Sequence, residues 1–410
     1  MSALTRPDRL TGFIAAGAAA ASLFAASAVP IPLLTMLRDA LHLTNASATA
    51  TTAGYFLGCT TALIGFSGLS NRIGRKLVTI AALFLSIASL ECLLHADSFT
   101  GLLVSRIIQG FAGGLVSSAA LAWFSDLALP ERPNLAAAGS AGLPSIGFCV
   151  GAPLAGLLAD QLGFAAFELS VRGAEIAIGT AACLALIAPE TLKRRALEPK
   201  PTERRRRAVL AVPAGLREYF PKAAAAFAAT WSFSSFGQSF ASPFCEHLGL
   251  GAAAGAAGLF YAAFILPNAC GGLLLGKFKP KRLDQETAAL MCFSLAAAAC
   301  LLGFSIGFAP LFFTAMFAAG IFAGLTCAAV IKSALERADA EERPQALSVL
   351  YLSGYFGSAL SGLMASFAAA SLPLEAVALL FICWLAGLFV FVRMRNRRAA
   401  GNAESNAQTA

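Results

Sequence analysis

The sequence predicts an all-α membrane protein with twelve transmembrane helices arranged as two pseudo-symmetric six-helix halves. Three observations lead to this prediction: a strongly apolar composition, twelve apolar runs of about the length of a bilayer span, and basic residues confined to alternate loops. The 410 residues have a mean hydropathy of +0.73 and only 13% are charged, whereas soluble domains carry roughly 25% charged residues. A lipid bilayer is therefore the expected solvent.

Each apolar run meets or approaches the roughly 20 residues that a helix needs to cross a bilayer. The first run is too long for the core of a signal peptide, so we expect it to remain as the first helix. The predicted spans are residues 12–35, 47–69, 77–95, 100–123, 135–159, 168–188, 222–244, 252–275, 285–307, 310–332, 345–370 and 374–394.

Basic side chains distinguish the two ends of the predicted bundle. The loops after odd-numbered helices hold only Arg38, with Arg172 at the mouth of the sixth helix. Apart from Arg106, every other Lys and Arg lies near a terminus or in a loop after an even-numbered helix. The positive-inside rule then places both termini in the cytoplasm and the protein in the cell (plasma or inner) membrane. Because these charges are spread over short loops, the net charge of +8 does not indicate a nucleic-acid partner.

Cysteine and histidine give no sign of a metal site or a cofactor. The ten cysteines are scattered through apolar runs without a CxxC spacing, and the three histidines lie near predicted outer loops without a spacing typical of ligands. We interpret the cysteines as small lipid- or core-facing residues. No metal and no cofactor is expected.

The longest predicted loop, residues 189–221, divides the chain. Its charges and prolines argue against a packed fold, so we predict a basic cytoplasmic linker between an N-terminal half (1–188) and a C-terminal half (222–394), followed by a cytoplasmic tail (395–410). The expected partner of the linker is anionic lipid of the cytoplasmic leaflet.

The two halves repeat short patterns. A tyrosine precedes a glycine by ten positions in the second and eighth helices, and two glycines recur four apart in the fourth and tenth. The matched positions are Tyr55 and Gly65 with Tyr261 and Gly271, and Gly110 and Gly114 with Gly320 and Gly324. These repeats indicate a duplicated six-helix unit.

The basic turn between the second and third helices carries the first family resemblance. The turn from Ser67 to Lys76 reads Ser-Gly-Leu-Ser-Asn-Arg-Ile-Gly-Arg-Lys. It is similar to the loop signature of the major facilitator superfamily, Gly-x-Leu-Ala/Ser-Asp-Arg-x-Gly-Arg-Arg/Lys. Ser67 stands where the family usually has Gly, and Asn71 where it usually has Asp.

Two further stretches extend the resemblance over essentially the whole chain. Arg106, Gln109 and Gly110 look like the signature of the fourth helix. Residues 147–156 resemble the antiporter signature of the fifth helix, with one extra residue before Pro153. The resemblance implies a secondary transporter that works by alternating access, close to the twelve-helix branch of drug or metabolite:proton antiporters. It implies a small-molecule substrate and no enzymatic activity, and we expect a monomer.

By the same resemblance, the turn and the fifth-helix stretch form a conformational gate. Gly74 supplies a backbone free to adopt positive φ, and Asp126 is placed to pair with Arg72 or Arg75 when the cytoplasmic side is shut. Asn71 offers no charge to a nearby helix N-terminus, so we hypothesise that the outward-facing state is less favoured than in a typical member. The expected gate residues are Asn71, Arg72, Gly74, Arg75, Lys76, Asp126, Gly147, Gly151, Pro153 and Gly156.

Arg106 is the main candidate for substrate or coupling chemistry. A charge inside the membrane costs at least a few kcal/mol, so it must face protein or water. The alternative is a buried arginine that bonds carbonyls of the first helix. Glu91 lies at a similar depth on the third helix and is its candidate partner in coupling, with outward snorkelling as the alternative. Arg172 and Glu175 are spaced for an ion pair on the sixth helix.

A polar face on the seventh helix provides candidate contacts from the C-terminal half. Trp231, Ser235 and Gln238 share roughly one face at helical spacing, which would be turned away from lipid. The alternative for each is helix packing. The full set of candidate substrate-binding residues is Arg106, Gln109, Trp231, Ser235, Gln238, Tyr55 and Asn268.

The functional prediction is export of a small amphipathic neutral or anionic compound, a drug or metabolite, coupled to protons. The first helix has no acidic residue, which argues against a cationic substrate and leaves Glu91 as the only evident proton carrier. The alternative is import of a small neutral or anionic nutrient by a symporter or uniporter. No intramembrane constellation suitable for an enzyme is visible in the sequence.

Overall fold

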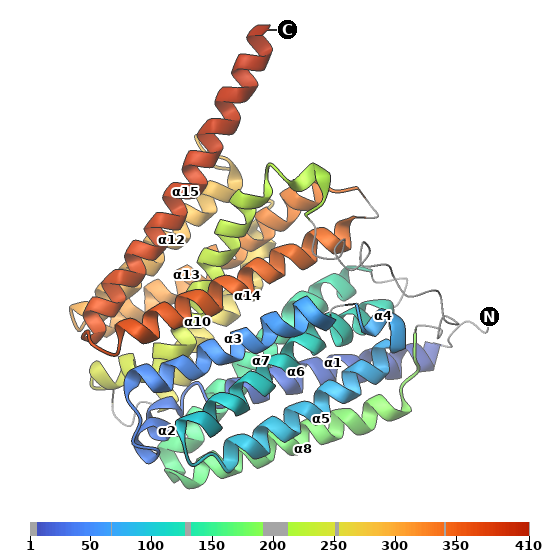
Figure 1. The fold of residues 1–410 in the computed structure, drawn as a ribbon, viewed down its shortest axis with the longest axis vertical. Helices are drawn as coiled ribbons and strands as arrows, with labels where there is room; N and C mark the ends of the chain where they lie inside the picture. The colour runs from blue at the N-terminus through green and yellow to red at the C-terminus, as the bar shows by residue number, and fades with distance from the viewer. Residues whose placement is uncertain are drawn as a thin grey trace.

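The structure is a computed structural model that describes residues 6–66, 68–127, 133–191, 212–250, 254–339 and 342–409. The described residues form twelve long helices and contain no strand (Figure 1). The long helices are α1 (Arg6–Ala28), α3 (Asn45–Phe66), α5 (Arg75–Leu94), α6 (Phe99–Leu127), α7 (Pro133–Leu162), α8 (Ala165–Ile187), α10 (Phe220–His247), α11 (Ala254–Gly271), α12 (Gln285–Ser305), α13 (Ala309–Arg337), α14 (Arg343–Ala368) and α15 (Leu374–Thr409). Shorter pieces are α2 (Leu34–Ala40), α4 (Ser70–Ile73), η1 (Ala214–Leu216) and η2 (Gly272–Leu274).

Each long helix falls on one predicted span, which confirms the predicted fold class. Ten of them are long and apolar enough to cross a membrane. The other two, α3 and α10, have the length but are more polar. Their polar side chains are buried against protein, where they can be satisfied away from lipid. The buried polar residues are Thr49, Thr51, Thr52 and Thr60 on α3, and Thr230, Ser232, Ser235, Gln238, Ser239 and Ser242 on α10.

The structure differs from the predicted boundaries at both ends of the chain. The first helix ends at Ala28, not near residue 35, and the chain turns before α2. Pro30 and Pro32 explain the difference, because proline has no N–H for an α-helical hydrogen bond. The last helix continues to Thr409, through the predicted tail. Of the predicted linker, residues 192–211 lie outside the described residues.

The two halves use the same helix pairings. In the N-terminal half α3 packs on α6, α5 on α6 and α1 on α7, and in the C-terminal half α11 packs on α13, α12 on α13 and α10 on α14. The halves are joined mainly by α3 against α14 and by α7 against α11, and also where α10 meets α2 and α3. The repeated sequence patterns therefore correspond to a repeated packing arrangement.

Glycines allow the closest of these crossings. A Cβ on Gly110 of α6 would overlap the carbonyl oxygen of Tyr55 on α3, and a Cβ on Gly58 would overlap the carbonyl of Ile107. In the second half, a Cβ on Gly320 of α13 would overlap the carbonyl of Phe264 on α11. Close backbone approach of this kind is how helices associate in lipid, where no hydrophobic force drives them together.

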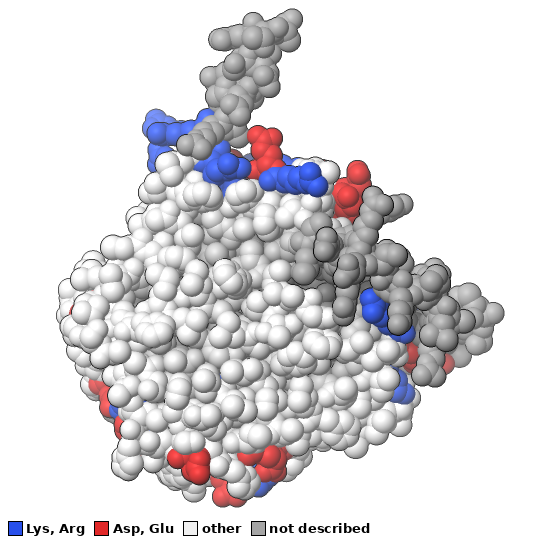
Figure 2. Space-filling model, in the orientation of Figure 1, with Lys and Arg blue, Asp and Glu red and all other residues white. Residues whose placement is uncertain are grey.

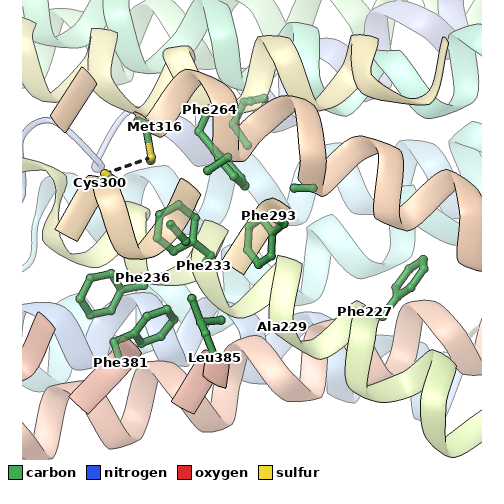
Figure 3. Packing of buried hydrophobic residues seen from close by; sticks show 14 of the residues in the cluster. Phe227, Ala229, Phe233, Phe236, Phe264, Phe293, Cys300, Met316, Phe381 and Leu385 are labelled. Carbon is green, nitrogen blue, oxygen red and sulfur yellow. Dashed lines mark hydrogen bonds between the residues drawn. The ribbon is translucent and has the colours of Figure 1, made fainter. Parts of the chain in front are cut away.

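The C-terminal half has an aromatic core centred on α10 (Figure 3). Phe236 stacks on Phe381 of α15 with ring centroids 4.1 Å apart. Phe233 meets Phe264 of α11 and Phe293 of α12 edge to face, at 5.4 and 5.7 Å. These rings hold three neighbouring helices around α10, and aromatic pairs of this geometry contribute about 0.5–1.5 kcal/mol each beyond their buried area.

Charged side chains lie at the margins of a broad uncharged belt (Figure 2). We call the end where α15 leaves the body the basic face; it carries Arg75, Lys222, Lys277 and Arg393. The opposite face carries Arg38, Asp160 and Glu246. The belt is the surface expected to meet lipid, and the two faces agree with the predicted alternation of basic loops.

Asp284 fastens α12 to α10 at the basic face. It is the N-cap of α12, where its carboxylate accepts hydrogen bonds from the Thr287 backbone N–H (3.2 Å) and from Lys222 Nζ (2.8 Å). Burial alone would raise the pKa of Asp284, but the hydrogen bond and charge of Lys222 outweigh it and hold this pKa below its ordinary value. Because the folded-state pKa is lowered, the carboxylate stabilises the fold above the ordinary pKa of Asp, about 4.

We predict that Asp284→Asn lowers stability by no more than about 1 kcal/mol at pH 7, because the pair is partly exposed and screened. Because asparagine can still cap the helix, the loss of stability measures the contribution of the carboxylate charge. The thermal midpoint of the native chain should fall more steeply than that of the variant as the pH drops through and below 4. Glu336→Gln, a change at an exposed carboxylate, is the control. Identical pH profiles for native and Asp284→Asn would contradict the assignment.

Candidate functional site

Arg106 of α6 is buried, with 2% of its surface exposed. Its Nη1 donates to the carbonyl oxygen of Ser27 on α1 (3.2 Å) and to Gln109 Oε1 one turn further along α6. Gln109 Nε2 donates in turn to the carbonyl of Ala26 (3.2 Å). The break in α1 makes this possible, because Pro30 has no N–H to give to the Ala26 carbonyl four residues earlier. The sequence thus supplies both the free carbonyls at the end of α1 and the arginine that donates to one of them.

These contacts match the alternative in which a buried arginine bonds carbonyls of the first helix. Glu91 is not the partner of Arg106: its carboxylate lies 2.5 Å from Arg172 Nη1 on α8, which also contacts Glu175 at 2.8 Å. Equal depth on two neighbouring helices does not fix the direction in which side chains point. The predicted pairing of Arg172 with Glu175 is confirmed.

The guanidinium of Arg106 retains donors for a ligand. Both of its hydrogen bonds to described residues come from Nη1, whereas a guanidinium has five N–H groups. The Arg106 side chain lies over the ring of Tyr55, 4.9 Å from its centroid. It also lines a small cavity of about 10 Å³ with Thr51, Thr52 and Leu102, large enough for about one water.

Gln238 of α10 offers an acceptor from the other half. It is 3% exposed, and its Nε2 donates to Tyr261 Oη of α11 at 2.8 Å. Ser234 Oγ lies 3.3 Å from the same hydroxyl. Gln238 Oε1 is buried and has no hydrogen-bond partner among the described residues. An unsatisfied buried acceptor costs about 1–3 kcal/mol, so a ligand that donates to it would be favoured.

An aromatic group continues the site towards the basic face. Trp231 of α10 is half-buried and meets Tyr355 and Tyr351 of α14 with centroid distances of 4.7 and 5.8 Å. Tyr355 Oη lies 3.2 Å from Ser117 Oγ of α6. Because α6 and α14 belong to different halves, this group spans the interface between them.

Two predicted residues have packing roles. Ser235 Oγ donates to the carbonyl of Ser358 on α14 (3.2 Å), as the helix-packing alternative predicts. Asn268 is half-buried on α11, where its backbone carbonyl packs against Gly324 of α13.

Sequence reasoning did not assign the tyrosines at the interface. In the sequence Tyr261 stands out only as part of the repeat, and Tyr351 and Tyr355 belong to none of the motifs. The chain has only five tyrosines, and with Tyr55 four of them lie in these contacts. These tyrosines could have been identified in the sequence because each lies inside an apolar run, where its hydroxyl needs a hydrogen-bond partner.

The basic turn is fastened within the N-terminal half. Gly74 has a φ of 108°, and Arg75 Nε lies 2.7 Å from Asp126 Oδ2 of α6. Glu190, after α8, accepts the backbone N–H groups of Arg75 and Lys76 at 3.2 and 3.0 Å. Of the two partners predicted for Asp126, Arg72 and Arg75, the structure shows Arg75. This pair joins helices of one half and is formed while the halves meet towards the opposite face. The expected link between this pair and closure of the basic face is thus not seen.

Glu190 supplies a carboxylate at the N-terminus of α5, the kind of charge that Asn71 lacks. The side chain of Asn71 and all of Ser67 lie outside the described residues, and Arg72 is exposed. Lys76 Nζ donates to the carbonyls of Leu186 and Ala188 at 2.7 and 2.8 Å, which ties the turn to the end of α8.

The predicted glycines of α7 divide into two groups. A Cβ on Gly147 or Gly151 would overlap a backbone carbonyl of α1, within one half. A Cβ on Gly156 would overlap the carbonyl of Ala254 on α11, in the other half. Asp160 Oδ2 also accepts the backbone N–H of Gly255 at 3.0 Å. Only Gly156 therefore lies where the two halves touch, with Pro153 beside the same crossing.

Other polar contacts join the halves at the same level. Ser242 Oγ of α10 donates to the carbonyl of Pro32 at 2.7 Å, and Thr49 Oγ1 of α3 donates to Ser366 of α14 at 3.0 Å. Arg38 Nη2 lies 3.5 Å from Glu246 Oε2. The halves are thus joined towards the opposite face.

Two similar six-helix bundles that meet through small, polar and aromatic side chains, with a buried arginine inside the first bundle, are typical of a membrane transporter. The chain belongs to the Major Facilitator Superfamily, whose family model matches residues 15–309. A bacterial homologue of the human lysosomal transporter Spinster, in an inward-facing and unoccupied conformation, has a TM-score of 0.73 at 17% identity, covering 96% of this chain and 98% of its own.

Two further solved structures share the fold. The same homologue in an inward-facing, occupied conformation has a TM-score of 0.71 at 16% identity, covering 96% of this chain and 98% of its own. A mutant of the nucleoside transporter NupG has a TM-score of 0.70 at 12% identity, covering 94% of this chain and 99% of its own. No curated protein sequence matches the chain.

We predict that Gly156→Val weakens the contact of α7 with α11. The added side chain clashes with backbone, and overpacking of this kind costs about 1–3 kcal/mol, so opening at the opposite face should rise about five- to hundredfold. The measurement uses Thr49→Cys in a chain whose native cysteines have been replaced. Opening at the opposite face should make this cysteine react faster with a thiol label. Gly179→Val is the matched control, because a Cβ there meets nothing within 4 Å. Equal labelling rates in the two variants would refute the prediction.

Proposed function

We propose that this protein is a secondary active transporter that works by alternating access and exports a small amphipathic neutral or anionic compound, a drug or metabolite, in exchange for protons. Two buried groups, one in each half, carry the proposal. Arg106 is a cation with N–H groups that make no hydrogen bond to described residues, and Gln238 Oε1 is an acceptor without a partner among them. A ligand bound between them would accept a hydrogen bond from Arg106 and donate one to Gln238 Oε1, and would so hold the halves together.

The charge of the site favours a neutral or anionic substrate. The described hydrogen-bond partners of Arg106 are a carbonyl and an amide, neither of which neutralises it. A cation in this space would be repelled, whereas a carboxylate or polarised carbonyl could accept from the guanidinium. The rings of Trp231, Tyr351 and Tyr355 offer an apolar surface to the body of an amphipathic molecule.

Proton coupling is supported by the antiporter-like stretch of α7, and Glu91 is the proposed carrier. Glu91, Arg172 and Glu175 form a cluster with two carboxylates on one arginine. Protonation of one carboxylate leaves a neutral pair. The proposal also places the basic face, and with it both termini, in the cytoplasm of a cell whose plasma or inner membrane holds the protein.

We predict that Arg106→Ala lowers export of preloaded anionic dyes at least about tenfold, because a hydrogen bond to a charged group contributes about 1.5–3 kcal/mol. Gln238→Leu should lower export of dyes that carry an N–H or O–H donor and leave others unchanged. The measurement is dye efflux from cells, with an anionic, neutral and cationic panel. Thr230→Val, on α10 but directed at its own helix and Cys327, is the control.

The same cells test coupling and direction. An uncoupler should stop export by the native chain, and Glu91→Gln should make the remaining transport insensitive to it. Export restricted to cationic dyes would refute the charge argument. Accumulation of the compounds in place of loss would favour the alternative, import of a small neutral or anionic nutrient.

A further inference from the structure

A second charged cleft lies at the basic face, away from the space between the halves. It has a volume of about 640 Å³ and is bounded by residues of α10, α12, α13 and α15 and of the loop before α12. Figure 2 shows Lys and Arg side chains gathered where α15 leaves the body. All of its walls belong to the C-terminal half, so movement of one half against the other does not open or close it.

The floor of the cleft is already compensated. Lys222 Nζ lies 2.8 Å from Asp284 Oδ2 and 2.9 Å from Glu286 Oε2, and the side chain of Glu286 is 7% exposed. Asn396 of α15 donates to Asp284 and, at 2.8 Å, to Thr287 Oγ1. These bonds fix α15 against the start of α12, so the cleft has built walls, not a chance gap between mobile side chains.

The rim carries an uncompensated positive charge. Lys222 and four arginines line the cleft against only two carboxylates, an excess of three positive charges. The arginines are Arg282, Arg337, Arg393 and Arg397. Among the described residues no carboxylate pairs with any of the four. Arg337 donates to the Ser333 carbonyl of its own helix at 2.7 Å and lies over the Tyr219 ring. By contrast, Arg395 is turned away and donates to the Glu218 carbonyl.

Arginine clusters without acidic partners match one ligand chemistry best. A planar guanidinium binds phosphate through two parallel hydrogen bonds, and several guanidinium groups can surround the oxygens of one phosphate. The position also indicates the source of the phosphate. The apolar run of α15 ends at Val392, directly before Arg393, so the cleft lies at the level where lipid headgroups begin. Basic clusters directly beside a membrane helix attract anionic lipid.

We propose that this cleft binds a phosphate group, supplied by the headgroup of an anionic phospholipid in the leaflet at the basic face. The phosphate contacts Arg393 and Arg397 on α15 and Arg282 on the facing loop, and so joins α15 to α12. The site is separate from the transport site and does not depend on the substrate proposed for it.

The test is the full chain in nanodiscs of phosphatidylcholine with and without phosphatidylglycerol, measured by lipid retention in native mass spectrometry and by thermal midpoint. A hydrogen bond to a charged group contributes about 1.5–3 kcal/mol, or about tenfold or more in affinity. The double variant Arg393→Gln/Arg397→Gln should therefore bind phosphatidylglycerol at least about a hundredfold less tightly, with a smaller rise in thermal midpoint.

Lys279→Gln/Lys281→Gln is the matched control, because it removes the same charge from the same face but from residues outside the cleft. It should retain phosphatidylglycerol almost as the native chain does. An equal loss in both double variants would overturn the proposal, since diffuse surface charge would then explain the binding. In detergent, inorganic phosphate is the second arm. If it stabilises the native chain and not Arg393→Gln/Arg397→Gln, while both retain phosphatidylglycerol equally, the site binds soluble phosphate and the lipid source is overturned.

Discussion

The structure depends on one constraint: in a bilayer, helices must satisfy their own backbone groups and associate without help from the hydrophobic effect. The chain meets it with glycines set against carbonyls, as where Gly110 meets Tyr55 on α3 and Gly320 meets Phe264 on α11. Backbones at this separation bring the ring of Tyr55 beneath Arg106. A glycine also meets a carbonyl between the halves, at Gly156. There the halves are joined by polar contacts and by aromatic pairs such as Phe148 with Tyr261.

The buried arginine follows from a break in the neighbouring helix. Pro30 ends α1 early and leaves carbonyls for Arg106 and Gln109 to bond. Carbonyls satisfy the donors without cancelling the charge, so the centre of the protein retains a positive field. The acidic residues that could have neutralised it lie elsewhere: Glu91 and Glu175 are held by Arg172. Because no described carboxylate neutralises Arg106, the proposed substrate is neutral or anionic.

The two halves share helix pairings but differ in what fills them. The C-terminal half is packed with phenylalanine around α10 and carries the buried Gln238. Its Trp231 packs against a cluster that includes Tyr55 of the other half. The N-terminal half is packed mainly with small and aliphatic side chains and carries the buried charge. The N-terminal half thus offers a cation, and the C-terminal half offers a hydrogen-bond acceptor and aromatic rings. Two copies of a duplicated unit can come to differ in this way when each accumulates its own substitutions.

The sequence by itself determined the class of fold, because apolar runs of bilayer length and alternating basic loops follow from the energetics of insertion and not from tertiary contacts. It also identified Arg106, Gln109 and Gln238, since polar groups in apolar runs must face protein. Only the tertiary structure decided their partners. The depth of Glu91 was readable from helix rise, but its direction was set by the rotation of α5 against α8. The sequence offered Arg72 or Arg75 as the partner of Asp126, and the structure shows Arg75. The contacts that join the halves depend on how α7 and α11 cross. Rotation and crossing angle are fixed by packing against distant helices, and a local pattern of residues does not contain them.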